Sequence, residues 1–225
     1  MERLNFTKRI NIFCGHYGSG KSEISVNAAA AVRKEHEHVI LADMDIVNPY
    51  FRSADAKNKL ESMNIKVLAP VYANTNVDVP VIGPEIEASL RNKDCNSILD
   101  VGGDEDGARI LGRFHMDISK NDYELFFVLN RARPMTLNFD ETLNYIGEIE
   151  AASRLKITKL ISNTHYLEET TVDDVLYGLE LAREVSEKTG IKLAAVSVMG
   201  GLERQLENKV DVPVFILKKN MILPF

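Results

Sequence analysis

The chain has 225 residues, of which 45% are hydrophobic and 27% charged, and its formal net charge is −6. This is the composition of an ordinary globular protein, and the length predicts one domain over residues 1–225. The acidic balance argues against nucleic-acid binding, because that binding depends on Lys and Arg that neutralise phosphates. No apolar run is long enough to span a bilayer, and the first ten residues contain no signal-peptide core, so we expect a cytoplasmic protein that does not bind a membrane.

Apolar, β-prone runs alternate with helical patterns along the chain. The predicted strands are 10–14, 38–43, 65–69, 97–101, 124–129, 158–162, 192–198 and 212–217. The predicted helices are 21–35, 84–92, 105–114, 136–154 and 171–189, with a short one near 201–208. Strands that alternate with helices and are rich in Val, Ile and Leu are typical of parallel strands buried on both faces. We therefore predict an α/β protein of three layers, with a mostly parallel sheet between two layers of helices.

The first predicted strand leads into a glycine-rich segment that matches the phosphate-binding pattern G-x-x-x-x-G-K-[ST]. A strand before this segment and an alanine-rich helix after it are the context that the motif needs. The alternative is a glycine-rich turn with an incidental lysine. We expect nucleotide binding by the segment Gly15, His16, Tyr17, Gly18, Ser19, Gly20, Lys21, Ser22 and Glu23.

The residue types of this segment suit a phosphate chain. Gly18 and Gly20 allow the backbone N–H groups to approach phosphate closely, and the following helix contributes its dipole. Lys21 is expected to lie between the β- and γ-phosphates, and the Ser22 hydroxyl is suited to coordinate Mg²⁺.

Carboxylates follow two of the predicted strands. Asp43 and Asp45 end the second strand, and Asp100 ends the strand 97–101. A capping role is enough to explain any one of them. Because ligands of such sheets bind at the carboxyl ends of the strands, the three together favour a Mg²⁺ site beside the glycine-rich loop.

The two cysteines lie far apart. Cys14 ends the first strand, and Cys95 lies in a polar segment before a later strand. We expect a buried small hydrophobe at the first position and a surface-loop thiol at the second, rather than a joint metal or redox site.

Three segments together, GHYGSGKS, DMDIVNP and ILDVGG, resemble those of the MinD/ParA-type ATPases. That family belongs to a wider group that includes the cobyrinic acid synthases and dethiobiotin synthetases. The resemblance is strongest from residue 10 to about 103, and it implies that the cofactors are ATP or ADP and Mg²⁺. It also implies catalytic roles for Lys21 and Asp45, with Asp45 orienting the attacking water. Asp43 would support the metal, and Asp100 would be the Walker B aspartate.

The resemblance also suggests how the base is read. Asn163, in the segment KLISNTH, matches the asparagine that reads adenine, and Pro213 falls where the last base-contacting loop of the family lies. The alternative for Asn163 is a loop residue that caps the next helix.

The chain departs from the family at one position. Family members of the K-G-G-x-G-K type carry a second lysine that acts across a dimer interface, and this chain has His16 and Tyr17 at that lysine and the glycine after it. Because histidine is shorter and largely neutral at pH 7, we expect slow hydrolysis and a monomer or weak homodimer.

Two classes of function follow. One is an ATP-driven switch for an unidentified protein partner, which the D-x-D motif favours. The other is a small-molecule ligase or kinase that activates a carboxylate, for which Arg131 and Arg133 offer basic groups at a strand end. A solvated loop explains the two arginines equally well.

Overall fold

The computed structural model describes residues 4–45, 57–69, 71–72, 80–81, 84–103 and 105–220. Within them, eight strands form one sheet in the order β10-β9-β8-β7-β1-β6-β2-β3, and every pairing in it is parallel. The strands are β1 (Ile10–Cys14), β2 (Val39–Asp43), β3 (Ile65–Leu68), β6 (Asn96–Asp100), β7 (Tyr123–Leu129), β8 (Lys159–Ser162), β9 (Lys192–Met199) and β10 (Val214–Leu217). A separate antiparallel pair joins β4 (Val71–Tyr72) and β5 (Pro80–Val81).

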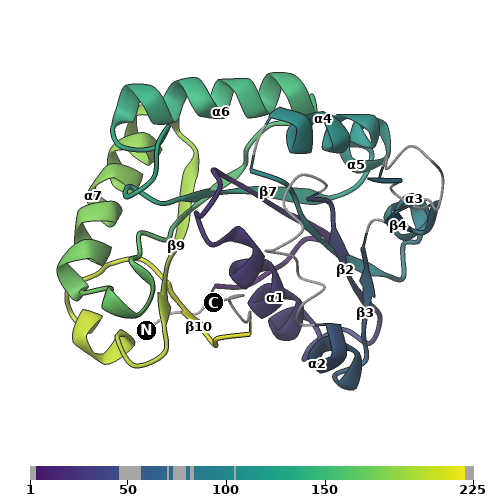
Figure 1. Ribbon diagram of the computed structural model, residues 1–225, viewed down its shortest axis with the longest axis horizontal. Helices are drawn as coiled ribbons and strands as arrows, with labels where there is room; N and C mark the ends of the chain where they lie inside the picture. The colour runs from purple at the N-terminus through teal and green to yellow at the C-terminus, as the bar shows by residue number, and fades with distance from the viewer. Residues whose placement is uncertain are drawn as a thin grey trace.

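Helices cover both faces of the sheet (Figure 1). They are α1 (Lys21–Val32), α2 (Lys57–Ser62), α3 (Pro84–Arg91), α4 (Glu105–Arg113), α5 (His115–Ser119), α6 (Phe139–Ser153) and α7 (Val172–Thr189). The apolar residues of α1 and α2 pack in one core cluster, and those of α3 to α6 and the second half of α7 pack in the cluster on the other face. Val172, Val175 and Leu179 of α7 pack in a third, smaller cluster with residues of β9 and β10. The predicted α/β fold with three layers is confirmed.

The central strands show why the sheet needs two layers. In β7, Leu125 and Phe127 belong to one core cluster, and Phe126 and Val128 belong to the other. All four side chains are 0% exposed. Because side chains alternate between the faces of a strand, a run that is apolar at every position must be covered on both sides.

The two longest helices have clear end signals in the sequence. The Asn138 side chain accepts from the backbone of Glu141 at the start of α6. Thr171 and Asp174 form a reciprocal capping box at the start of α7, and Gly190 ends that helix in the left-handed conformation. These caps satisfy backbone groups that a helix end leaves unpaired.

Three features differ from the expectations. The segment expected to be helical near 201–208 is a 3₁₀ turn at Glu203–Leu206. The short helices α2 and α5 were not anticipated, because five or six residues carry too little periodicity to be recognised. Cys95 is buried, with 3% exposure, so the expectation of a surface thiol was wrong. Cys14 is buried, as expected.

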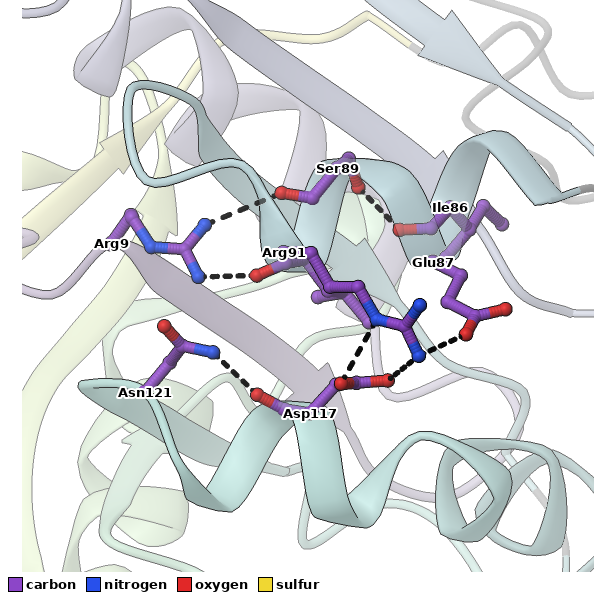
Figure 2. A network of polar contacts seen from close by, with 8 residues as sticks. Arg9, Ile86, Glu87, Ser89, Arg91, Asp117 and Asn121 are labelled. Carbon is purple, nitrogen blue, oxygen red and sulfur yellow. Dashed lines mark hydrogen bonds and ion pairs between the residues drawn. The ribbon is translucent and has the colours of Figure 1, made fainter.

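An arginine network ties α3 to the amino-terminal end of the sheet (Figure 2). Arg9, directly before β1, donates to the carbonyls of Ser89 and Leu90 at 3.3 and 2.5 Å, and to those of Asn92 and Cys95 at 2.9 and 3.0 Å. Its guanidinium thus caps the end of α3 and the turn before β6. Partial burial lowers the pKa of Arg9 from its ordinary value. Among the described residues, no helix is both long and apolar enough to cross a membrane.

Candidate phosphate-binding site

The glycine-rich loop lies at the centre of the sheet. It follows β1, which pairs with β6 on one side and β7 on the other. Ligands of open parallel sheets bind at the carboxyl ends of the strands where the strand order reverses, and β1 is at that position. The fold therefore brings the ends of β2, β6, β7 and β8 around residues 15–23.

The loop leaves the first turn of α1 open to an anion. Gly20, the residue before α1, has φ 86°, and no side chain caps the helix start. A Cβ on Gly15, where φ is 146°, would lie 2.4 Å from the Val128 carbonyl oxygen, so only glycine fits there. Uncapped N–H groups and the helix dipole together form a binding site for phosphate.

Four buried charges lie around this loop. Lys21 is 5% exposed, and Asp43, Asp45 and Asp100 are 0%, 3% and 0% exposed. Asp43 and Asp100 are paired positions on the neighbouring strands β2 and β6. The backbone N–H of Asp45 donates to Asp43 Oδ1 at 3.0 Å. The fold thus brings the three aspartates that the sequence singled out to one edge of the sheet.

The surroundings of Asp100 raise the pKa of its carboxyl group. Burial raises its pKa to about 6, against the opposing effects of the Lys21 charge and of hydrogen bonds from Ser22 and Ser25. Asp45 raises it further. Ser25 Oγ donates to Asp100 Oδ1 at 3.3 Å, whereas Asp100 Oδ2 is buried without a hydrogen-bond partner in the described part of the chain.

These groups fit Mg²⁺ of the kind that accompanies a phosphate chain. A hydroxyl beside a buried carboxylate with an unsatisfied oxygen suits a hard cation that keeps its waters. Among the described residues, no group of three or more His, Cys, Asp or Glu side chains could hold a metal ion. The cation would therefore depend on phosphate oxygens and water as well as on Ser22 and the aspartates.

Asn163, directly after β8, forms a hydrogen bond to the backbone of the phosphate loop. Its Nδ2 donates to the carbonyl of Ser19 at 2.6 Å, and its Oδ1 accepts from Ser197 Oγ at 2.8 Å. The residue is 4% exposed. Both ends of the amide are thus engaged by the protein, and a contact with adenine would have to add to these bonds or replace them.

Residues of the loop after β7 also form hydrogen bonds to the backbone of the phosphate loop. Asn130 Nδ2 and Arg133 Nε both donate to the Gly18 carbonyl, at 3.3 and 3.1 Å. Arg131 is turned toward α7 instead, where it donates to the Tyr177 carbonyl at 2.8 Å and its guanidinium lies 3.7 Å from the centre of the Tyr177 ring. The two arginines, equivalent by sequence, have different surroundings.

His16, in the phosphate loop, faces α6. His16 Nδ1 lies 2.9 Å from the Tyr17 carbonyl oxygen, and its ring is edge-on to Tyr145, with 5.9 Å between the ring centres. Tyr145 also donates to the Gly103 carbonyl at 2.6 Å. A Cβ on Gly103 would lie 2.6 Å from the backbone nitrogen of Tyr17. The segment after Asp100 therefore packs directly against the phosphate loop.

Two further residues of the expected nucleotide site lie beside other elements. Pro213 directly precedes β10, whose first residue, Val214, pairs with Val196 of β9, which in turn pairs with Ser162 at the carboxyl end of β8. Pro213 therefore lies near the level of the carboxyl end of β8, and its contact with the base stays a prediction. Glu23, in the first turn of α1, accepts from the backbone and side chain of Asn220 at 2.8 and 3.0 Å.

Sequence reasoning missed several residues of the site. Asn130, Ser197 and Tyr145 contact the loop, Asn163 or Gly103 from elements far along the chain. Only Asn130 carried a usable signal, as a polar residue at the end of a buried strand. A cavity of about 470 Å³ lies elsewhere, between α4 and α6, and its lining includes Arg109, Arg113 and Arg154.

Comparison with known proteins supports the fold. No protein-family model and no curated protein sequence matches the chain. Solved structures do resemble it. The cell division protein FtsY of Thermotoga maritima has 17% identity and a TM-score of 0.55, over 88% of this chain and 64% of that one. The 54 kDa signal recognition particle protein of Aeropyrum pernix, in complex with GDP, has 17% identity and a TM-score of 0.50, over 84% and 42%.

FlhF complexed with GTP and Mg²⁺ has 13% identity and a TM-score of 0.51, over 85% of this chain and 66% of that one. The chain thus spans between 42% and 66% of the length of these three structures. At such low identity the likeness concerns the fold alone. Together with the parallel sheet and the central glycine-rich loop, it shows that this chain has the fold of the P-loop NTPases.

Proposed function

We propose that this chain is a Mg²⁺-dependent nucleoside triphosphatase of the MinD/ParA type that uses ATP as a switch for a protein partner. The observation that carries the proposal is the arrangement of the loop. An uncapped helix start and the buried Lys21 lie beside three buried aspartates, and Asp100 Oδ2 has no hydrogen-bond partner in the described part of the chain. Such a site favours a phosphate chain with its cation over a neutral ligand.

Each polar group has a defined task in this proposal. Lys21 binds the β- and γ-phosphates, and Ser22 with Asp43 and Asp100 holds the cation and its water shell. Asp45 orients the attacking water. A Cβ on Gly102 would lie 3.3 Å from Asp45 Oδ1, so this carboxylate packs against the backbone that follows Asp100.

The switch is supported by the packing of that backbone. Gly102 and Gly103 are in close contact with Asp45 and Tyr17 on one side. On the other side, a Cβ on Gly107, in α4, would lie 2.6 Å from the Gly102 carbonyl oxygen. A change at the γ-phosphate therefore has a short route into α4, where a partner can read it.

ATP is proposed as the nucleotide on the chemistry near β8. The residues that follow this strand, Asn163 to Tyr166, include no carboxylate. Guanine presents two neighbouring donors on its pairing edge and is best matched by a carboxylate, whereas adenine needs none. Since two of the similar structures are complexes with GDP or GTP, ATP and GTP must be compared directly.

Calorimetry with Mg-ATP, Mg-ADP and Mg-GTP tests the proposal. We expect ATP and ADP to bind and ATP to be preferred over GTP, with Asp45→Asn keeping affinity and losing hydrolysis. A preference for GTP contradicts the ATP assignment, and normal hydrolysis by Asp45→Asn contradicts the role of that residue.

Hydrogen exchange tests the switch. We expect binding of ATP to Asp45→Asn to change the protection of residues 101–113 as well as that of the loop. If only the loop responds, the chain binds nucleotide without acting as a switch. Light scattering of the same complex should show a monomer or weak dimer, and a stable dimer that His16→Ala disrupts would contradict the expectation for His16.

The carboxylate-activating alternative is less favoured. It relied on two arginines at one strand end, and Arg131 is engaged by Tyr177 and lies 3.6 Å from Glu180. Arg133 remains near the loop, where its role is best explained as part of the phosphate site itself.

A further inference from the structure

Arg133 is the one arginine of the β7 loop that contacts the phosphate loop. Its Nε donates to the Gly18 carbonyl at 3.1 Å. A Cβ on Gly18 would lie 3.0 Å from Nε and 3.2 Å from Cζ of this arginine. The guanidinium therefore packs against the bare glycine backbone, which a larger residue at position 18 would prevent.

The backbone around Arg133 is held in place. Its N–H donates to the Asn130 carbonyl at 3.0 Å, and Thr136 Oγ1 donates to the carbonyls of Asn130 and Arg133 at 2.7 and 3.2 Å. Asn130 and Thr136 are 0% and 1% exposed. An arginine on such a support is already ordered before ligand binds, which lowers the entropic cost of a contact.

The charge of Arg133 has no acidic partner in the described part of the chain. The structure shows no ion pair to it, and its two terminal nitrogens have no hydrogen-bond acceptor among the described residues. Arg131 differs on each count, since Glu180 and the Tyr177 carbonyl engage it. A guanidinium that uses only Nε for support keeps the paired terminal nitrogens that bind phosphate oxygens.

The electrostatics of the site call for a second cation. Three buried aspartates surround one buried lysine, and a triphosphate would bring more negative charge than Lys21 and a bound Mg²⁺ together neutralise. His16 occupies the position of the family's second lysine but is directed to the Tyr17 carbonyl and the Tyr145 ring. His165, which also lies near the loop, has its pKa lowered to about 4 by burial and by the Arg133 charge, so it is neutral at pH 7.

We propose that Arg133 is the second cation of the phosphate site, binding the phosphate chain of the nucleotide from within the same chain. The proposal rests on the proposed nucleotide binding and assigns to one residue the charge that His16 does not supply. Its ligand chemistry is a polyphosphate, and the base plays no part in the contact.

The test uses inorganic tripolyphosphate and Mg-ATP as probes, with affinities measured by calorimetry. We expect Arg133→Ala to weaken both about tenfold, as the loss of a charge-assisted hydrogen bond would. Arg133→Lys, which keeps the charge, should lose less than Arg133→Gln, which keeps only polarity. Arg131→Ala is the matched control, with expected affinities within about twofold of wild type because that residue faces α7.

The outcomes separate this proposal from the function it rests on. If wild type binds neither probe, nucleotide binding itself is wrong. If wild type binds and Arg133→Ala equals Arg131→Ala, only the role of Arg133 fails. If Arg133→Gln binds as well as Arg133→Lys, the residue supports Gly18 without contacting phosphate, and the proposal is again overturned. The Lys and Gln pair decides the matter even if the Ala variant folds poorly.

Discussion

Two arginines that donate to backbone carbonyls lie at opposite edges of the sheet. At the amino-terminal edge, Arg9 uses both terminal nitrogens on four carbonyls around the end of α3. Figure 2 shows its contact with the Ser89 carbonyl. At the carboxyl-terminal edge, Arg133 uses only Nε, on Gly18. The terminal nitrogens of Arg9 are thus used within the protein, whereas those of Arg133 stay available for a ligand.

The contrast extends to the surroundings of each arginine. Arg9 connects elements whose own backbone groups needed donors, as the end of any helix does. Arg133 contacts the phosphate loop, whose glycine backbone leaves room for a ligand beside the uncapped start of α1 and the buried carboxylates. We therefore expect changes at the first edge to act on stability and changes at the second to act on binding.

Lys21→Ala should have the largest effect. Removing the buried cation of the carboxyl-terminal edge should weaken Mg-ATP about 100-fold or more, because hydrogen bonds to charged groups contribute up to about 3 kcal/mol each. Calorimetry measures the loss, with Lys188→Ala, an exposed residue paired with Glu184, as the control. Unchanged affinity in Lys21→Ala would mean that the loop does not bind phosphate.

Arg9→Ala should lower stability and leave nucleotide affinity unchanged. It removes the donor to four carbonyls and should lower the free energy of unfolding by about 2–3 kcal/mol, while the folded fraction keeps its affinity for nucleotide. Chemical denaturation measures the first effect and calorimetry the second.

The control for Arg9 lies in the same network. Arg91→Ala breaks exposed pairs with Glu87 and Asp117 and should cost less than about 1 kcal/mol. An equal loss in the two variants would show that the carbonyl contacts of Arg9 have no special weight.

Asn163→Ala tests whether the amide reads the base or holds the loop. Because Asn163 is bound to Ser19 and Ser197, the structure predicts a similar loss, about tenfold, for ATP, GTP and tripolyphosphate. Ser197→Ala should give a smaller loss of the same pattern. A loss confined to ATP would instead support the adenine contact inferred from the family resemblance.

Substitution of His165 should have the smallest effect, which is a change in how far acid lowers the stability of the protein. Its pKa is lowered to about 4, below its ordinary value of 6.5, mainly by burial, so the unfolded chain binds its proton more readily than the folded chain. The resulting stability is fully present above pH 6.5 and is lost as the pH falls toward 4. Over this pH range, the free energy of unfolding of His165→Gln should fall by roughly 1 kcal/mol less than that of wild type, given the partial exposure of the ring. Thermal unfolding at several pH values measures the difference. If the stability of His165→Gln and that of wild type depend on pH in the same way, the lowered pKa of His165 is contradicted.

Much of the fold could be predicted because its signals are local. All eight strands of the sheet were expected within two residues of their observed ends, since each is a short apolar run between polar segments. The phosphate loop was recognisable because its chemistry needs adjacent residues. The end of α1 was placed three residues too late, at 35 instead of Val32, because the polar residues that follow are as common in helices as in turns.

The supports of the site could not be predicted in the same way. Arg133 meets Gly18 across 115 positions, and Asn163 meets Ser19 across 144. The sequence also does not show that the register of the strands brings Val214, next to Pro213, level with Ser162 at the end of β8. Arg131 and Arg133 are two positions apart, and nothing in their local sequence distinguishes them.

The sequence alone therefore determined the alternation of strands and helices, the loop at residues 15–23 and the aspartates that end β2 and β6. It could do so because hydrophobic periodicity and phosphate chemistry act over a few neighbouring residues. Only the tertiary structure decided which arginine contacts the loop and what engages the Asn163 amide. Those contacts depend on the order of the strands in the sheet, which places β7 and β8 beside β1 through interactions between residues far apart in the chain.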